Sequence, residues 1–83
     1  MMDKLMQCFE NLGIFLEDIQ KFDIDKDIED SLEFISLIVE IEEVFEINIP
    51  DEYLDRKRLR NINSIKDMIV EISNNAGGDN ENS

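Results

Sequence analysis

The sequence predicts a small all-α protein, a three-to-four-helix bundle with a long first loop and a short third helix. Apolar residues recur at intervals of three and four in separate stretches, which is the period of a helix with one buried face. The composition, 42% apolar and 35% charged, is typical of a globular domain. A domain of roughly 70 residues buries only about 60% of its unfolded surface, so we expect one small core.

The first helix is predicted from an apolar stripe near the N-terminus. Gly13 interrupts the stripe and costs about 1 kcal/mol relative to alanine inside a helix, so we expect the helix to end there and an ordered loop to follow. The acidic stretch from Lys21 to Asp30 is interpreted as loop. The stripe consists of Leu5, Cys8, Phe9, Leu12, Leu16 and Ile19.

The second helix is the best-defined element. Asp30 and Glu33 stand at the spacing of a capping box, which places the start of the helix at this point. Two apolar lines then run along it, and its many glutamates argue against burial on all sides, which leaves one line for a partner. The predicted core line is Phe34, Leu37, Ile38, Ile41 and Phe45, and the second line is Leu32, Ile35 and Val39.

Two further helices are predicted in the C-terminal half. Pro50 suits the first position of a short helix, with Asp51 and Glu52 in its opening turn. Ser64 and Asp67 form a second capping-box pattern and predict the start of the last helix. We expect a folded domain over residues 1–73 and a disordered polar tail over 74–83. The predicted buried face of the last helix is Ile62, Ile65, Met68, Ile69 and Ile72.

The charge balance excludes several classes of partner. Acidic residues outnumber basic ones 21 to 8, which gives a formal charge of −13. Nucleic acids and anionic membrane surfaces both require a surplus of Lys and Arg, so neither is expected as a partner. No apolar run approaches the roughly 18 residues of a membrane span, and the N-terminus lacks a signal-peptide pattern. We therefore expect a cytoplasmic protein that does not insert into membranes. We also expect a monomer.

The sequence offers few groups for catalysis. The chain has no histidine and one cysteine, so a zinc site and a nucleophile–base pair both lack their usual residues. We expect no enzyme activity. Cys8 lies on an apolar stripe and is interpreted as a buried, inert thiol. The four basic residues of the 56–60 stretch are interpreted as partners of nearby carboxylates rather than as a phosphate-binding patch.

The acidic loop also raises a calcium-binding hypothesis. Asp23, Asp25 and Asp27 match the first three side-chain ligands of an EF-hand loop. The pattern then fails, because Ile28 stands where the loop needs glycine and Phe34 stands where it needs a bidentate glutamate. A solvated acidic loop is favoured, and no metal site is predicted.

One stretch of the chain resembles a known family. Asp30-Ser31-Leu32 opens a two-faced acidic helix that carries Glu42-Glu43 and Phe45 and is followed by Ile49-Pro50-Asp51. This arrangement is similar to the acyl carrier proteins, and the likeness covers about 70 of the 83 residues. Ile28 stands where the family usually has glycine. The longer stretch between Pro50 and Ile62 resembles the D-alanyl carrier proteins and other stand-alone carriers that work with adenylating enzymes.

The resemblance implies a site and a cofactor. Ser31 would accept 4′-phosphopantetheine from coenzyme A through a phosphopantetheinyl transferase, and Asp30 would help present it. The arm's thiol would hold an acyl or aminoacyl group as a thioester and deliver it to loading and transfer enzymes. The cargo stays open between fatty acyl, polyketide, D-alanyl and other aminoacyl groups. A small acidic helical interaction or calcium-binding module without a prosthetic group is the alternative.

The second apolar line has a place in this hypothesis. Between Phe22 and Asp55 there are 13 acidic residues and one basic residue, which surround Ser31 with negative charge. Complementary charge speeds the encounter with a basic partner, and a small apolar patch fixes its register. We expect partner docking to involve Leu32, Glu33, Ile35, Val39, Glu42 and Glu43.

Overall fold

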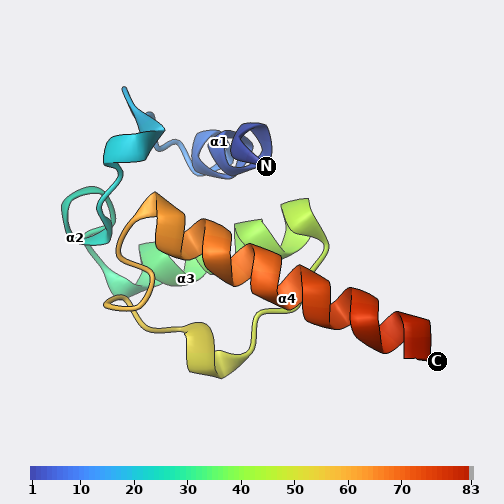
Figure 1. Ribbon diagram of the computed structural model, residues 1–83. Coiled ribbons are helices and arrows are strands. Elements are labelled where there is room, and N and C mark those ends of the chain that lie inside the picture. Colours follow the sequence, from blue (N-terminus) through green and yellow to red (C-terminus); the bar gives the residue numbers. More distant parts are fainter. Residues whose placement is uncertain (83) are drawn as a thin grey trace.

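The computed structural model is all-helical over the part of the chain that it describes, the backbone of residues 1–82 and the side chains of residues 1–75. This confirms the predicted fold class. In Figure 1, α4 passes in front of α3, and α1 lies to one side of them. The elements are α1 (Met2–Asn11), the 3₁₀ helix η1 (Ile19–Lys21), α2 (Ile24–Asp27), α3 (Ser31–Phe45), the 3₁₀ helix η2 (Asp51–Tyr53) and α4 (Ile62–Asn82).

The hydrophobic core lies between α1, α3 and α4 and is closed by apolar residues of the loops. α1 packs against α3, and η1 contacts α4. All five predicted core positions of α4 are buried, and four of the five on α3 are buried, with Phe45 half-buried. In the described part of the chain, no polar or charged residue is buried as a whole. The interior is therefore held by apolar packing.

The end of α1 confirms the role expected for Gly13. The helix ends at Asn11, and Gly13 adopts a positive φ of 75°. This conformation strains residues that carry a Cβ atom, so glycine suits the position. The Gly13 N–H donates to the carbonyl oxygen of Glu10 at 3.0 Å, which closes the helix. Leu16 in the loop and Ile19 at the start of η1 are partly buried, so the segment after the helix packs on the core.

The acidic stretch from Lys21 to Asp30 differs from the predicted loop. It contains the last residue of η1 and the four-residue helix α2, so the loop interpretation was wrong for these residues. Its apolar residues Phe22, Ile24 and Ile28 are buried in the core, whereas Asp25 between them is exposed and Asp23 and Asp27 are half-buried. Alternation of acidic and apolar residues anchors the stretch to the bundle because every apolar side chain in it finds a core contact.

The start of α3 confirms the predicted cap. Asp30 is the N-cap residue, and its Oδ1 atom accepts a hydrogen bond from the Glu33 N–H at 2.7 Å. The carbonyl oxygen of Asp30 accepts from the Phe34 N–H at 3.1 Å, the first hydrogen bond of the helix ladder. At the other end, Glu46 takes a left-handed conformation, with φ 55° and ψ 49°, and closes the helix.

Two predicted helix starts in the C-terminal half were wrong. Pro50 precedes the short helix, which is a single 3₁₀ turn beginning at Asp51. α4 begins at Ile62 rather than Ser64, because the Oδ1 atom of Asn61 provides the cap. It accepts from the Ser64 N–H at 2.9 Å and from the Ser64 hydroxyl at 3.0 Å. Asparagine and serine are comparable capping residues, and in this structure the Asn61 oxygen makes the capping bond.

The division into a domain and a tail stays a prediction. The backbone of α4 continues to Asn82, whereas the side chains of residues 76–83 lie outside the described residues. In the part of the chain that the structure describes, no helix is long and apolar enough to cross a membrane.

Candidate functional site

Ser31 is the first residue of α3, at the junction with the segment that leads from α2. Its side chain is exposed, as are those of Asp30 and Glu29 before it. Asp30 supplies the capping oxygen for this helix. The Ser31 hydroxyl is therefore presented at an exposed helix start without serving as the cap itself.

The segment before Ser31 is held by its own backbone and by Ile28. This residue is completely buried, and its backbone is extended, with φ −122° and ψ 99°. Its N–H donates to the carbonyl oxygen of Ile24 at 2.9 Å. An extended backbone suits any residue, so isoleucine fits here without strain. The buried side chain anchors the chain two residues before Asp30.

Two of the four basic residues of the 56–60 stretch pair with nearby carboxylates, as predicted for the whole stretch. The Arg56 Nη2 atom lies 3.7 Å from Asp25 Oδ1, and Arg60 Nε lies 3.6 Å from Asp23 Oδ1. Arg58 differs, because its guanidinium stacks on the Tyr53 ring with 4.2 Å between Cζ and the ring centroid. Most of this positive charge is therefore engaged within the molecule.

The second apolar line of α3 lies at the surface beside Ser31. Leu32 is 81% exposed, and Ile35 and Val39 are each 44% exposed, whereas Phe34 on the core line is 5% exposed. We refer to Leu32, Ile35 and Val39 as the outer apolar line. The structure thus separates the two apolar lines of α3 as the sequence indicated, while the docking role of the outer line stays a prediction.

The three glutamates expected at the docking surface differ in exposure and in hydrogen bonding. Glu43 is exposed, and Glu33 is half-buried at the first turn. Glu42 is also half-buried, and its Oε2 atom accepts a hydrogen bond from the Ile49 N–H at 2.8 Å. Its carboxylate therefore holds the turn after α3. Sequence reasoning missed this role, because a charge on an amphipathic helix carries no signal of an intramolecular partner.

The three loop aspartates have separate partners. Asp25 faces Arg56, Asp23 faces Arg60, and Asp27 Oδ2 lies 4.0 Å from Lys26 Nζ and accepts from the Asp23 N–H at 3.1 Å. Among the described residues, no group of three or more acidic, histidine or cysteine side chains is placed to hold a metal ion. The arrangement is that of single ion pairs at a surface.

Cys8 is buried as predicted. The side chain is fully enclosed, and no disulfide involves it. Burial, with a smaller contribution from the Glu40 carboxylate, raises the pKa of the Cys8 thiol from 9.0 to about 11. The thiol is therefore protonated at neutral pH and is a poor nucleophile.

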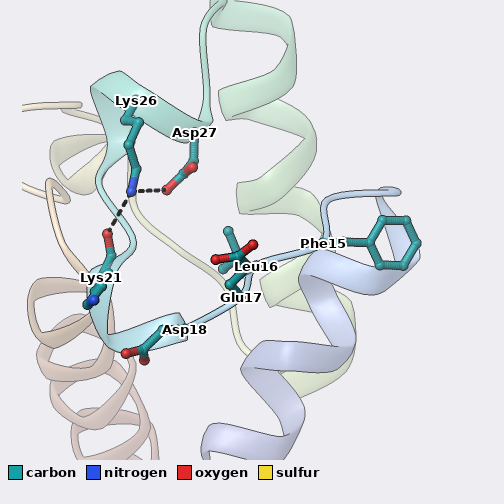
Figure 2. Close-up of a pocket in the computed structure, with 7 residues that line it drawn as sticks. All are labelled: Phe15, Leu16, Glu17, Asp18, Lys21, Lys26 and Asp27. Carbon is teal, nitrogen blue, oxygen red and sulfur yellow. Dashed lines mark hydrogen bonds and ion pairs between the residues drawn. The ribbon is translucent and has the colours of Figure 1, made fainter.

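A cavity of about 330 Å³ lies between the loop after α1 and the α2 segment (Figure 2). Lys26 Nζ donates to the carbonyl oxygen of Lys21 at 3.3 Å across one side of it, while the Phe15 ring points away from the other side chains. Its mixed charges match no single ligand class, and no pattern in the sequence indicates this cavity. The lining residues are Phe15, Leu16, Glu17, Asp18, Lys21, Lys26 and Asp27.

Comparison with known proteins gives one relative over most of the chain. A D-alanyl carrier protein from Streptococcus uberis is 32% identical over 76 residues, which cover 87% of this chain and 94% of the relative. No protein-family model matches the sequence. No solved structure matches it either. The near-complete coverage of both chains means that the likeness includes the start of α3 and the loop before α4.

Proposed function

This chain belongs to the family of acyl and aminoacyl carrier proteins, and on that premise we propose that Ser31 carries a 4′-phosphopantetheine arm. The protein is a carrier. When bound, the arm supplies a thiol that holds an acyl or aminoacyl group as a thioester. We propose that a phosphopantetheinyl transferase attaches it from coenzyme A, and that Asp30 helps to present Ser31.

The observation that carries the proposal is the position of Ser31. It is an exposed serine at the first position of a 15-residue helix whose cap is supplied by its neighbour, Asp30. The hydroxyl is therefore accessible to another enzyme, and its modification leaves the cap intact.

The surroundings of Ser31 fit a phosphodiester. The start of a helix presents unpaired N–H groups and a partial positive charge, which together stabilise a phosphate by about 0.3–1 kcal/mol at an exposed position. Asp30 and Glu33 oppose this effect, but both carboxylates lie near solvent, where counter-ions screen them. An exposed junction also leaves room for a long arm, since Leu32 is the next side chain and projects into solvent.

The cargo that we propose is a D-alanyl group. The support comes from the Streptococcus uberis relative, whose name states this cargo, and from the resemblance of the stretch between Pro50 and Ile62 to D-alanyl carriers. An adenylating enzyme would then load the arm. The test is to offer the modified protein to such an enzyme with D-alanine, L-alanine and a fatty acid in parallel. We expect loading with D-alanine, and selective loading with a fatty acid would contradict this cargo.

We propose that partner enzymes bind the outer apolar line and the acids around it. Glu43 is exposed beside this line, and Glu33 lies at its start. Glu42 adds negative charge, but its Oε2 atom is engaged by Ile49, so Glu43 is better placed for direct contact with a basic partner. Such contacts favour encounter and orientation more than tight binding, which suits a carrier that must leave again.

Intact mass is the decisive measurement for the arm. The protein is co-expressed with a broad-specificity transferase, and we expect a gain equal to one phosphopantetheine that maps to Ser31. Ser31→Ala should gain nothing, while Ser36→Ala and Ser64→Ala serve as matched controls and should be modified normally. Ser36 lies further along α3, and the Ser64 hydroxyl is bonded to Asn61. A wild-type protein that gains no mass would instead favour an acidic interaction module.

A further inference from the structure

Two segments far apart in the sequence meet just before Ser31. The Ile24 N–H donates to the carbonyl oxygen of Arg60 at 2.8 Å, and Asp23 forms an isolated antiparallel bridge with Asn61. The loop before α4 therefore lies along the chain that leads into α3.

Arg56 makes the most extensive of these contacts. Its Nη2 atom donates to the carbonyl oxygen of Ile24 at 3.3 Å and to that of Ile28. Its Cζ atom lies 5.8 Å from the ring centroid of Phe34. Ile28 precedes Ser31 by three residues and Phe34 follows it by three, so one guanidinium contacts the chain on both sides of Ser31.

The carbonyl contacts lie at the C-terminal end of α2. The Ile24 carbonyl oxygen already accepts from the Ile28 N–H at 2.9 Å, whereas the Ile28 carbonyl oxygen follows the last residue of this four-residue helix and accepts from Arg56. A positive side chain at a helix C-terminus satisfies these oxygens and interacts favourably with the dipole. The planar guanidinium also fits the face of Phe34, which an ammonium group does less well. Arg56 therefore suits this position by shape as well as charge.

The same side chain contributes less to global stability than its number of contacts suggests. Its Nη1 atom is buried and has no hydrogen-bond partner among the described residues, which offsets part of the gain from Nη2. The ion pair with Asp25 adds little, because the Asp25 side chain is 64% exposed and the charges are screened. The main effect of Arg56 is therefore local, on the path of the chain around Ser31.

We propose that Arg56 is a positioning residue for the modification of Ser31, a role that rests on the proposed function. By holding the Ile28 carbonyl and the Phe34 ring together, it fixes the direction in which Asp30 and Ser31 leave the loop. A transferase must bring the Ser31 hydroxyl in line with the pantetheine-bearing phosphorus of coenzyme A, so that the serine oxygen loses its proton and bonds to phosphorus while the pyrophosphate bond breaks and adenosine 3′,5′-bisphosphate leaves. A small misplacement of a reacting group lowers the rate of such a step steeply. Arg56 acts through the backbone and touches neither the hydroxyl nor coenzyme A.

The test compares Arg56→Gln, Arg56→Lys and the wild type as substrates of the transferase. We expect Arg56→Gln to lower kcat about tenfold or more while KM for the carrier changes less than about twofold, because the outer apolar line is unaltered. Arg56→Lys keeps the charge and N–H donors on a single nitrogen but loses the planar guanidinium, so its kcat should lie between those of the wild type and Arg56→Gln. Arg58→Gln is the matched control. This variant removes the same charge from the same loop. The native Arg58 side chain stacks on Tyr53 rather than on the chain around Ser31, so the kcat of Arg58→Gln should equal that of the wild type.

Amide exchange in the unmodified proteins shows whether the effect is local. We expect the N–H groups of Ile28 and Glu33 to exchange faster in Arg56→Gln, while that of Ile69 in α4 exchanges as in the wild type. An unchanged kcat, or a loss of kcat accompanied by faster exchange at Ile69, would overturn the positioning role. A wild-type protein that accepts no arm would overturn the proposed function as well, which distinguishes the two failures.

Discussion

The two faces of α3 carry the same kinds of side chain in opposite surroundings. The inner face buries Phe34, Leu37, Ile38 and Ile41 against α1 and α4, whereas the outer apolar line stays in water. Burying an aliphatic side chain stabilises the folded protein by about 1.5–3 kcal/mol relative to leaving it exposed. The exposed side chains of the outer apolar line do not provide this full stabilisation. An exposed Leu32 or Ile35 thus adds little to stability and leaves apolar surface available to a partner.

The acidic residues sharpen the difference between the faces. Glu40, Glu42 and Glu43 stand at the rim or on the outer side of α3, and the described interior holds no charged residue. Negative charge around an apolar line repels other copies of this acidic chain and attracts basic surfaces. The outer face therefore favours basic partners over acidic ones, whereas an uncharged apolar patch would not distinguish between them.

The largest effect that would sharpen this comparison is expected at Ile41. This side chain is completely buried in the inner face. Ile41→Ala should lower the free energy of unfolding by about 2–5 kcal/mol, because truncation loses apolar contacts and leaves a cavity. Urea unfolding followed by circular dichroism measures the change. A loss below about 1 kcal/mol would mean that the inner face is less tightly packed than the structure shows.

A smaller loss is expected for Glu42, which lies between the faces. Glu42→Ala removes the acceptor of the Ile49 N–H and should lower the free energy of unfolding by about 1–2 kcal/mol. Glu43→Ala removes an exposed carboxylate with the same change in charge and should alter it little. The same urea titrations compare the two variants. Equal losses would contradict the distinction between a structural and a surface glutamate.

The Asp30 cap at the N-terminus of α3 should contribute about 1 kcal/mol to the free energy of unfolding. Asp30→Ala removes the acceptor for the Glu33 N–H and should destabilise the protein by about 0.5–2 kcal/mol, whereas Asp30→Asn keeps a capping oxygen and should cost less. Thermal melts of both variants measure this difference. If Asn destabilised as much as Ala, the charge of Asp30 rather than its hydrogen bond would be the stabilising feature.

Substitutions on the outer apolar line should hardly affect stability. Val39→Ala and Ile35→Asp are each expected to change the free energy of unfolding by less than about 0.5 kcal/mol. Both should slow loading by the partner enzyme, and Ile35→Asp should slow it more because it places a charge in the contact. The measurements are a melt and a loading assay on each variant. An Ile35→Asp protein that unfolds as readily as Ile41→Ala would show that α3 has one apolar face rather than two.

The core residue Cys8 of α1, which packs against α3, predicts an effect at alkaline pH. The pKa of the Cys8 thiol is raised in the folded protein from 9.0 to about 11, mainly by burial. Below pH 9 the thiol is protonated in both states, and as pH rises from 9 toward 11 only the unfolded chain readily loses the proton. Stability should therefore fall over this range, and Cys8→Ala should lack this part of the pH dependence. Parallel slopes for the two proteins would contradict a buried thiol.

Prediction from the sequence succeeded for the buried faces of the helices, where the helical period determines which residues are buried. The stripes of α3 and α4 were read correctly because burial on a helix repeats every three to four residues. The starts of α4 and of the short helix were misplaced by one or two residues, since Asn61 and Ser64 are comparable caps and only geometry decides between them. Short-range patterns contain no record of which residues meet across the fold, so the contact between Arg56 and Ile28 was missed.

The candidate site shows the same division. The helix start at Asp30 and Ser31 could be predicted from a local pattern, because a cap and the residue after it are adjacent in the chain, while the functional role of both residues stays a prediction. The internal role of Glu42 could not, because its partner Ile49 is reached only when the turn after α3 folds back. The alternation of acids with Phe22, Ile24 and Ile28 is a signal in the sequence that the acidic stretch packs on the core.

One contact with a later part of the chain lies at each end of α3, and the two contacts close loops of very different length. Glu42 and Ile49 are seven residues apart, whereas Arg56 and Ile28 are 28 residues apart. Two doublings in loop length add about 1.2 kcal/mol of closure entropy, which must be offset before the longer contact forms. We expect the C-terminal end of α3 to be organised early in folding and the end that holds Ser31 to be completed last. Folding and unfolding rates of Glu42→Ala and Arg56→Gln would test this order. The first should slow folding, and the second should mainly speed unfolding.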